Sequence, residues 1–363
     1  MQKTNLHLFI PLLFLLISLS SCSLNDFNEK EIVFKNSFDG TELAGTLTLP
    51  DPTGKVPAVL LVHGSGPHNR NLEFMDNKKL FKDLAEYLTT NGIAVLRYDK
   101  RGVGMSTGQF LPYDMENFKN DAIAGIKYLK TVGQIDTSKI GVIGISQGGL
   151  VVQMMAAQSP DINFAVMLGS PGIWGKDFIY STQKEITKAA GFKEEDIKDM
   201  TVIFDQLWPF LEKDQLTADE VYRGKLLLKR LWNYIDNESR KDFGFVDEAI
   251  DFWFNLYRSE TLRNFYNYDP SKNLQRITCP VLAITGDKDV QAPSKENLPV
   301  IESALKRGKC NNFEIIELKN HNHIFQQCTT GKISEYKTIN GTMSDESLEI
   351  IKDWILKTTG SRN

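Results

Sequence analysis

The sequence predicts an α/β protein with a mostly parallel sheet, helices on both faces of it, and an inserted cap of helices. Short apolar stretches of strand length alternate with helical stretches in both halves of the chain, as in parallel sheets that are buried on both faces. This alternation stops between residues 173 and 268, where only helical stretches rich in aromatic residues occur. Polar, glycine-containing segments follow several of the predicted strands, at the edge where such sheets place their functional residues.

The first 21 residues resemble an export signal rather than part of the fold. A lysine near the start precedes residues 8–19, which are apolar but too short to span a bilayer as a helix. The sequence Leu19-Ser20-Ser21-Cys22 resembles the lipobox of bacterial lipoproteins. We therefore expect residues 1–21 to be cleaved and Cys22 to carry the lipid that anchors the protein in the cell envelope. Ser23 favours the outer membrane, and an ordinary secretory signal with an incidental cysteine is the alternative.

The remainder divides into a tether and a folded part. Residues 22–30 are polar and are expected to form the tether. Residues 31–172 and 269–363 are expected to form the two parts of one α/β core, and residues 173–268 the helical cap. The cap begins after the strand that follows the central one, where it is able to cover the edge of the sheet.

The predicted elements follow from hydrophobic period and turn residues. Apolar runs predict the strands, and apolar residues at helical spacing predict the helices. Asp39-Gly40 is a hairpin-turn signal between the first two strands. Strands are expected at residues 32–38, 41–48, 57–63, 93–98, 164–168, 280–285 and 313–318, with another beginning at residue 139. Helices are expected at residues 74–88, 118–129, 150–157 and 347–357.

The segment Gly144-Ile145-Ser146-Gln147-Gly148 is the most informative motif. It has the G-x-S-x-G pattern of a nucleophile elbow, a tight turn between a strand and a helix that exposes a serine. The pattern is weak alone, but here an apolar strand precedes it and an apolar helix follows it. Because a serine hydroxyl is a poor nucleophile, it needs a base and backbone N–H groups directed at the oxyanion. Ser146 is therefore the candidate nucleophile.

Two later strands end in segments that supply the partners such a serine needs. Gly286-Asp287-Lys288-Asp289 follows one, and Lys319-Asn320-His321-Asn322-His323 follows the other. The order Ser, Asp, His places an acid and a base at the carboxyl edge of the sheet with the serine. The residues themselves do not distinguish Asp287 from Asp289, or His321 from His323.

Five segments in this order resemble the α/β-hydrolase superfamily, and within it a bacterial carboxylesterase group related to the prolyl-oligopeptidase and dienelactone-hydrolase branches. They are His63-Gly64-Ser65-Gly66-Pro67, residues 98–104, residues 144–148, residues 286–289 and residues 322–326. The resemblance covers nearly everything after residue 31. It implies Asp289 as the acid and His323 as the base, with Asp287 and His321 as the less favoured alternatives. It also implies a structural role for His63, while His68 is read as a loop residue near the mouth of the site.

The function that this resemblance implies is hydrolysis of carboxylic esters by a Ser146, His323, Asp289 triad through an acyl-enzyme. The N–H groups of Ser65 and Gln147 are the expected oxyanion hole. A serine peptidase acting on small peptides is the alternative within enzymes. A catalytically silent binding lipoprotein is the alternative of a different class.

The net charge and the cysteine content limit which classes of partner and which disulfides are expected. The formal net charge of −4 becomes −5 once residues 1–21, with one lysine, are removed, so a nucleic-acid partner is not expected. Cys279, Cys310 and Cys328 remain besides Cys22, which permits at most one disulfide, and we expect at least one buried free thiol. No cofactor or metal is expected, and the partner is a small ester substrate. In the Asp99-Lys100-Arg101 segment, we expect Asp99 and Arg101 to hold the turn after the strand.

Overall fold

The computed structural model describes residues 27–51, 54–75, 77–111 and 114–361. The predicted signal peptide, Cys22 and most of the predicted tether lie outside these residues. No helix within the described ranges is long and apolar enough to span a membrane.

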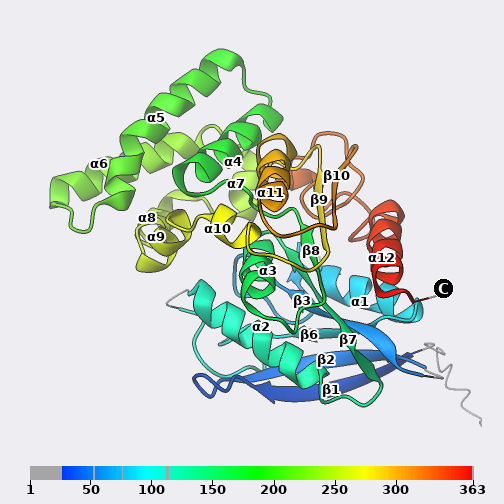
Figure 1. Ribbon diagram of the computed structural model, residues 1–363. Coiled ribbons are helices and arrows are strands. Elements are labelled where there is room, and N and C mark those ends of the chain that lie inside the picture. The colour runs from blue at the N-terminus through cyan, green and yellow to red at the C-terminus, as the bar shows by residue number, and fades with distance from the viewer. Residues whose placement is uncertain (1–26, 52–53, 76, 112–113, 362–363) are drawn as a thin grey trace, which may run out of the picture.

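An eight-stranded sheet forms the centre of the molecule (Figure 1). Its order is β1-β2-β6-β3-β7-β8-β9-β10. The strands from β6 to β10 run parallel, and β2 is antiparallel to both of its neighbours. The strands are β1 (Phe27–Lys35), β2 (Glu42–Pro50), β3 (Val56–Val62), β6 (Ala94–Tyr98), β7 (Ile135–Ile145), β8 (Phe164–Leu168), β9 (Val281–Gly286) and β10 (Phe313–Leu318).

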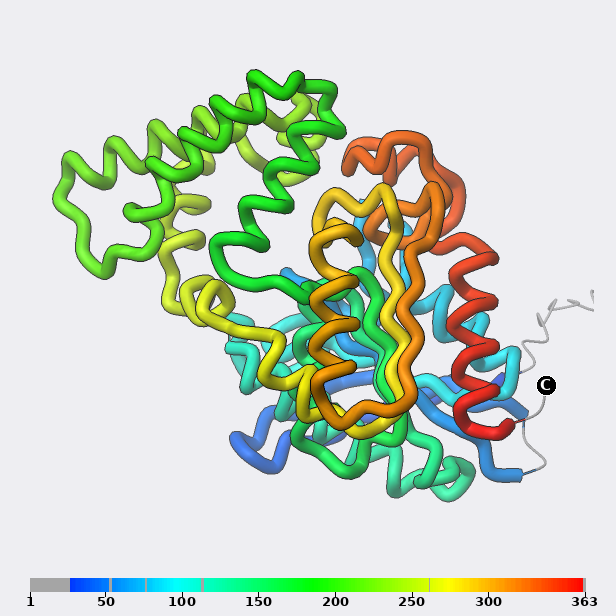
Figure 2. The backbone as a smooth tube through the Cα atoms, turned by 45° about the horizontal axis from the view of Figure 1, so that its top comes forward, coloured from blue at the N-terminus to red at the C-terminus, as the bar shows by residue number. Residues whose placement is uncertain are grey.

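Helices cover both faces of this sheet because its central strands are apolar on both sides. One buried cluster joins the sheet to α2, α3, α10 and α11, and a second joins the opposite face to α1 and α12. Figure 2 shows α11 and α12 on opposite sides of β9 and β10. The helices are α1 (Leu80–Thr90), α2 (Met115–Leu129), α3 (Gln147–Gln158), α10 (Pro270–Leu274), α11 (Ser294–Arg307) and α12 (Asp345–Thr359).

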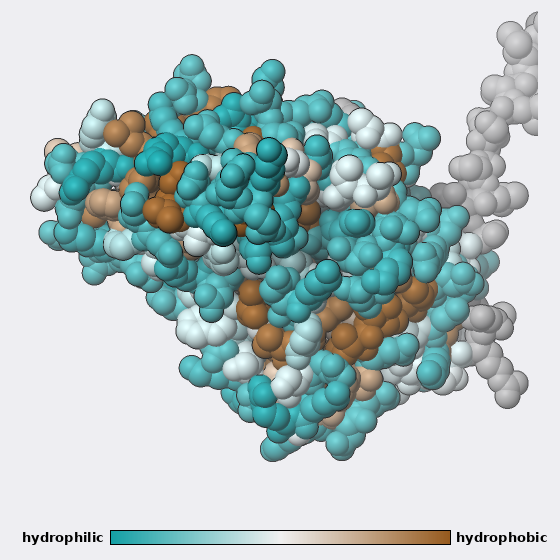
Figure 3. Space-filling model, turned by 90° about the horizontal axis from the view of Figure 1, so that it is seen from above, coloured by the Kyte–Doolittle hydropathy of each residue, from teal (hydrophilic) through white to brown (hydrophobic). Residues whose placement is uncertain are grey.

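The remaining helices form a separate lobe between β8 and β9, which we call the cap (Figures 1 and 2). It has its own buried cluster, in which aromatic residues such as Phe204, Trp208 and Trp232 pack against leucine and isoleucine. In the view of Figure 3 the outer surface of the cap is mostly hydrophilic, with smaller apolar patches. The helices are α4 (Gly175–Ala189), α5 (Glu194–Glu212), α6 (Ala218–Trp232), α7 (Asn237–Asp242), α8 (Ile250–Tyr257) and α9 (Glu260–Tyr266).

This architecture confirms the predicted fold class. The predicted turn after β6 is also confirmed: Asp99 binds Arg70 and the N–H of Met105, and Arg101 binds Asp121. Cys279, Cys310 and Cys328 are all free thiols, and Cys310 is buried.

Several predicted boundaries are wrong: α2 begins at Met115 and β7 at Ile135, three and four residues before the predicted positions. Two differences are larger. The strand expected from residue 32 begins at Phe27, so residues 27–30 of the predicted tether belong to β1. An edge strand has one solvent-facing side, and Glu29 there pairs with Arg97, which is why a polar sequence is accommodated. The helix expected from residue 74 begins at Leu80, because residues 73–74 and 78–79 form a short antiparallel pair, β4 and β5.

Candidate active site

Ser146 lies in a strained turn between β7 and α3. Its φ of +55° and ψ of −125° are rare for a residue other than glycine. Such a turn needs small neighbours: a Cβ added to Gly144 would lie 2.3 Å from the Gly148 carbonyl oxygen, and one added to Gly148 would lie 2.2 Å from the Val62 carbonyl oxygen. The strand, the turn and the helix therefore have the geometry of a nucleophile elbow.

Asp289 and His323 meet at the carboxyl edge of the sheet. Asp289 follows β9 and His323 follows β10, and His323 Nδ1 lies 2.8 Å from Asp289 Oδ2. The other carboxylate oxygen accepts hydrogen bonds of 2.8 Å from the N–H groups of Gln291 and Ala292. Both side chains are almost fully buried. The carboxylate is thus held by backbone groups in a position that orients the imidazole.

The rival residues have other partners. Asp287 Oδ1 accepts a 2.7 Å hydrogen bond from the Asn320 N–H. His321 Nδ1 lies 2.7 Å from the Lys319 carbonyl oxygen, and its Nε2 lies 2.7 Å from Ser344 Oγ. The structure therefore brings His323, and not His321, to an aspartate, and that aspartate is Asp289.

The Asp289–His323 pair lies against the end of β8, which is hydrogen-bonded to the serine strand β7. The Ser146 N–H donates a 2.8 Å hydrogen bond to the carbonyl oxygen of Leu168. The next residue, Gly169, has a φ of +52°, and a Cβ there would lie 3.1 Å from both Asp289 Oδ2 and His323 Nδ1. A residue without a side chain at this point lets the pair approach the serine strand closely.

Ser146 and His323 line one cavity of about 270 Å³, which we call the serine cavity. Its walls are mostly apolar, and they come from both the core and the cap. Phe243, at the end of α7, is the contribution of the cap. The other lining residues are Gly64, Ser65, His68, Leu72, Phe74, Met75, Ile145, Gln291, Ile324, Ile333 and Tyr336.

The two predicted oxyanion donors lie beside this cavity. Gln147 is the first residue of α3 and is buried, and the N–H groups of a first helical turn have no partner within the helix. Ser65 lines the cavity itself. A Cβ on Gly64 would lie 3.2 Å from Ser146 Cβ, so the loop with Ser65 passes directly over the serine.

Lys100 binds the backbone of this loop. It is buried, and its ammonium group donates hydrogen bonds of 2.5 Å to the Gly64 carbonyl oxygen and 3.0 Å to that of Gly66. The Lys100 Nζ also lies 4.7 Å from the centre of the Phe118 ring. No sequence pattern predicts this role for Lys100, although Lys100 occupies the middle of the Asp99-Lys100-Arg101 segment.

For the ester hydrolysis that the sequence resemblance implies, we expect Lys100→Met to lower kcat/KM about ten- to hundredfold, mostly through kcat. Displacement of a positioning loop by an ångström has effects of that size. Steady-state kinetics on a p-nitrophenyl ester measure it. Lys319→Met, which alters an exposed lysine, is the control. An unchanged kcat would contradict a positioning role.

The free energy of unfolding of Lys100→Met should also depend on pH differently from that of the unmodified protein. Burial lowers the pKa of Lys100 from 10.5 to about 7, so between these values the unfolded chain binds more protons than the folded one. The free energy of unfolding should therefore rise with pH over this window, by up to about 1.4 kcal/mol per pH unit. Urea unfolding at several pH values should show this slope to be smaller in Lys100→Met.

The side chain of His63 is buried and binds residues other than the candidate residues, in keeping with a structural role. Its Nε2 lies 3.0 Å from the Asn69 carbonyl oxygen, and its ring packs 4.8 Å from that of Phe81. Burial, with a smaller contribution from Lys100, holds its pKa well below the usual value. His68 lines the serine cavity and its Nε2 binds the Ser65 carbonyl oxygen.

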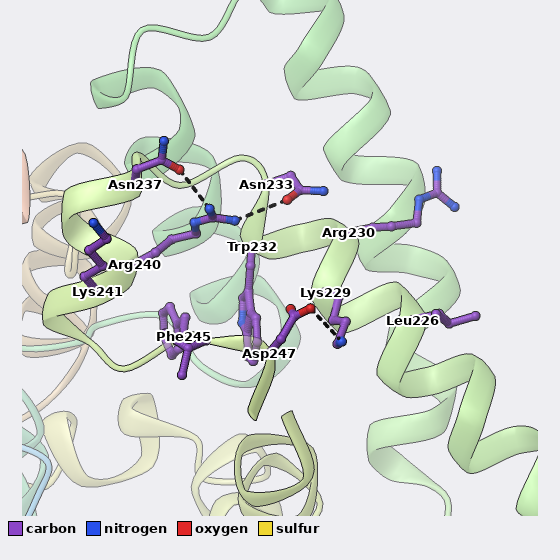
Figure 4. A pocket seen from close by; sticks show the side chains of 11 residues that line it. Leu226, Lys229, Arg230, Trp232, Asn233, Asn237, Arg240, Lys241, Phe245 and Asp247 are labelled. Carbon is purple, nitrogen blue, oxygen red and sulfur yellow. Dashed lines mark hydrogen bonds and ion pairs between the residues drawn. The ribbon is translucent and has the colours of Figure 1, made fainter. Parts of the chain in front are cut away.

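A larger pocket of about 750 Å³ lies on the surface of the cap and contains none of the candidate residues (Figure 4). Two of its cations have partners: Lys229 pairs with Asp247 at 3.1 Å, and Arg240 binds Asn233 and Asn237. Within the described part of the chain, no group of three His, Cys, Asp or Glu residues is arranged to hold a metal ion.

Sequence reasoning missed Phe243, Gln291 and Tyr336 as lining residues of the serine cavity. Phe243 and Tyr336 lie in segments without a motif, so no sequence signal marks them. Gln291 lies two residues after Asp289, and its position was the only available indication.

The chain resembles known hydrolases in sequence and in structure. The family model described as "Serine aminopeptidase, S33" matches residues 55–231. The chain is 27% identical over 301 residues to Esterase EstD of Thermotoga maritima, and 28% identical over 191 residues to Dipeptidyl-peptidase 5 of Porphyromonas gingivalis. These matches cover 82% and 51% of this chain, but only 60% and 25% of the two relatives.

Among solved structures, Pyrococcus furiosus esterase Pf2001 superposes with a TM-score of 0.56 at 18% sequence identity. The superposition covers 92% of this chain and 91% of the esterase. At this identity the likeness shows a shared fold, and the strained turn at Ser146 and the sheet order agree with it. The chain therefore has the α/β-hydrolase fold.

Proposed function

We propose that the protein is a serine hydrolase that cleaves carboxylic esters with Ser146 as nucleophile, His323 as base and Asp289 as the residue that orients it. The observation that carries this proposal is the 2.8 Å contact between His323 Nδ1 and Asp289 Oδ2 at a cavity that also contains Ser146. With Nδ1 bound to the carboxylate, Nε2 is the nitrogen available to the serine hydroxyl.

In this proposal His323 accepts the proton of Ser146 Oγ while Oγ attacks the ester carbonyl carbon. The oxyanion accepts hydrogen bonds from the N–H groups of Gln147 and Ser65, and His323 then donates the proton to the departing alcohol. Water attacks the resulting acyl-enzyme with His323 again as base, releasing the acid and the free serine. Asp289 stabilises the imidazolium during both steps.

Esters are favoured over peptides because the relative named as an esterase matches a larger part of this chain than the peptidase does, 82% against 51%. A serine peptidase is the second candidate, since the matching family model is described as a serine aminopeptidase. The chemistry of Ser146, His323 and Asp289 is the same in both reactions, so substrates distinguish them.

The test compares p-nitrophenyl acetate and butyrate with alanine and proline p-nitroanilides, and adds a fluorophosphonate probe followed by peptide mass spectrometry. Ester hydrolysis together with a probe adduct on Ser146 is the expected result. Faster cleavage of the anilides would instead favour the peptidase. The absence of both hydrolysis and a probe adduct would overturn the proposal and would favour a catalytically silent binding protein.

A further inference from the structure

A second cavity, of about 210 Å³, lies inside the cap, and we call it the cap cavity. It shares two lining residues, Phe243 and Gln291, with the serine cavity. These two side chains therefore stand between the serine and the interior of the cap. The other lining residues are Ile179, Thr182, Gln183, Ile186, Phe204, Leu207, Leu211, Leu228, Leu231, Trp232, Ile235, Phe245, Tyr257 and Tyr266.

Two aromatic residues separate the cap cavity from the surface pocket of Figure 4. Trp232 and Phe245 line both spaces, and their rings stack 5.3 Å apart at an interplanar angle of 11°. Figure 4 shows these two rings beside each other below α7. These two rings thus form an aromatic wall of the cap cavity, and Phe245 also stacks on Phe243 at 5.3 Å.

The chemistry of the lining indicates what the cap cavity binds. Leucine, isoleucine and aromatic side chains supply most of it, and several of them are almost completely buried. Tyr266 is only 4% exposed, yet its buried hydroxyl has no hydrogen-bond partner among the described residues. Because an unpaired buried hydroxyl is costly, this group is positioned to bond a polar atom of a ligand in the cavity.

The two shared lining residues lie where the cap meets the core: Phe243 comes from the cap and Gln291 from the core. Phe243 directly follows α7, and α7 is bound to the loop after β10: the Ser334 N–H donates a 3.2 Å hydrogen bond to Ser239 Oγ, and Lys337 pairs with Glu238 and Asp242. The loop also supplies Ile333 and Tyr336 to the serine cavity. The position of Phe243 is therefore coupled to the wall beside the serine.

We propose that the cap cavity is a substrate subsite for one apolar arm of the ester, an arm that carries a hydrogen-bonding group near its end, and that Phe243 borders its entrance. This inference rests on the proposed function and specifies the substrate class. An apolar arm on either the acyl or the alcohol side has the required chemistry. Such an arm passes Phe243 and lies among the leucine and isoleucine side chains, with its polar group at Tyr266.

The test fills or enlarges the cap cavity at Leu228 of α6, which is 4% exposed. Each methylene that enters an apolar site is expected to raise kcat/KM about fourfold. Leu228→Trp should therefore lower the ratio of kcat/KM for p-nitrophenyl octanoate to that for the acetate at least about tenfold. Leu228→Ala should shift the preference to longer chains. A parallel series from ethyl acetate to octyl acetate tells whether the arm belongs to the acyl or the alcohol side.

The matched control is Leu226→Trp, which introduces the same side chain on the same helix at a position that is 44% exposed and outside the cap cavity. Its chain-length profile should equal that of the unmodified protein. If Leu228→Trp does not fold, the chain-length ratio of kcat/KM is measured in Leu228→Ala and Phe243→Ala instead. Both substitutions enlarge the space available to an apolar arm. Unchanged ratios in both ester series would overturn the subsite while the ester hydrolysis itself stands. Absence of ester hydrolysis in the unmodified protein would overturn the proposed function instead.

Tyr266→Phe tests the polar end of the subsite. The unmodified protein should prefer an ω-hydroxyalkanoate ester to the alkanoate ester of equal length, and the variant should lose this preference about five- to tenfold, as for one neutral hydrogen bond. With the hydroxyl removed, the plain alkanoate should be hydrolysed at least as well as before. Equal preferences in the two proteins would overturn the role of Tyr266.

Discussion

Ser146→Ala should lower kcat for ester hydrolysis by at least about 10⁴-fold, because the acyl-enzyme cannot form without the hydroxyl. Ser65, the other serine that lines the serine cavity, is not expected to replace Ser146 as nucleophile. It lies on the loop that supplies an oxyanion donor, and its backbone carbonyl oxygen is bound by His68. The substitution also removes only one oxygen atom, so the fold should be retained. Any remaining rate would come from the N–H groups and the bound geometry.

The measurement is the rate of p-nitrophenyl acetate hydrolysis with the fluorophosphonate adduct as a second readout. Ser138→Ala is a matched control, since Ser138 is exposed at the beginning of the same strand, β7. We expect it to have full activity and full labelling. Labelled and active Ser146→Ala protein would show that the nucleophile is a different residue.

Asp289→Asn should lower kcat about 10⁴-fold with a much smaller effect on KM, because an amide in place of the carboxylate favours the wrong imidazole tautomer and does not stabilise the imidazolium. Asp289 Oδ1 accepts from the N–H groups of Gln291 and Ala292. An amide oxygen is able to accept both of these, which leaves its NH₂ group facing His323 Nδ1. The substitution therefore retains the loop geometry and changes only the protonation of the histidine.

The matched control is Asp287→Asn, two residues earlier in the same turn. Asp287 Oδ1 accepts from the Asn320 N–H and its side chain is more exposed than that of Asp289, so we expect a change in kcat of less than about tenfold. Stopped assays at several substrate concentrations separate kcat from KM. A larger loss of kcat in Asp287→Asn than in Asp289→Asn would contradict the assignment of the acid.

Much of the fold was predictable because the apolar period is strong in this chain. The central strands, such as β3 and β8, are continuous apolar runs, and a strand buried on both faces requires that composition. The predicted ends of strands and helices were wrong where pairing with a distant segment competes with the local sequence pattern. The polar residues 27–30 enter β1 because β2 offers them a full antiparallel ladder, and no local signal reports such a partner.

In the candidate site, too, some residues were predictable from the sequence and others were not. The G-x-S-x-G pattern identified Ser146 because the tight turn restricts its neighbours in sequence to small residues. Asp289 and Asp287 are two residues apart, as are His323 and His321, and their chemistry is identical. Only the packing of β9 against β10 shows that His323 faces Asp289, whereas His321 binds Ser344.

Local patterns in the sequence were sufficient to predict the α/β class, the helical insertion and the turn that carries Ser146, since each depends on hydrophobic period or on the size of adjacent residues. Three features became visible only in the folded protein: the pairing of Asp289 with His323, the support of the Gly64 loop by Lys100 and the place of Phe243 between two cavities. These features join segments that are distant along the chain. Their distances and burial arise from packing between elements, which no local pattern encodes.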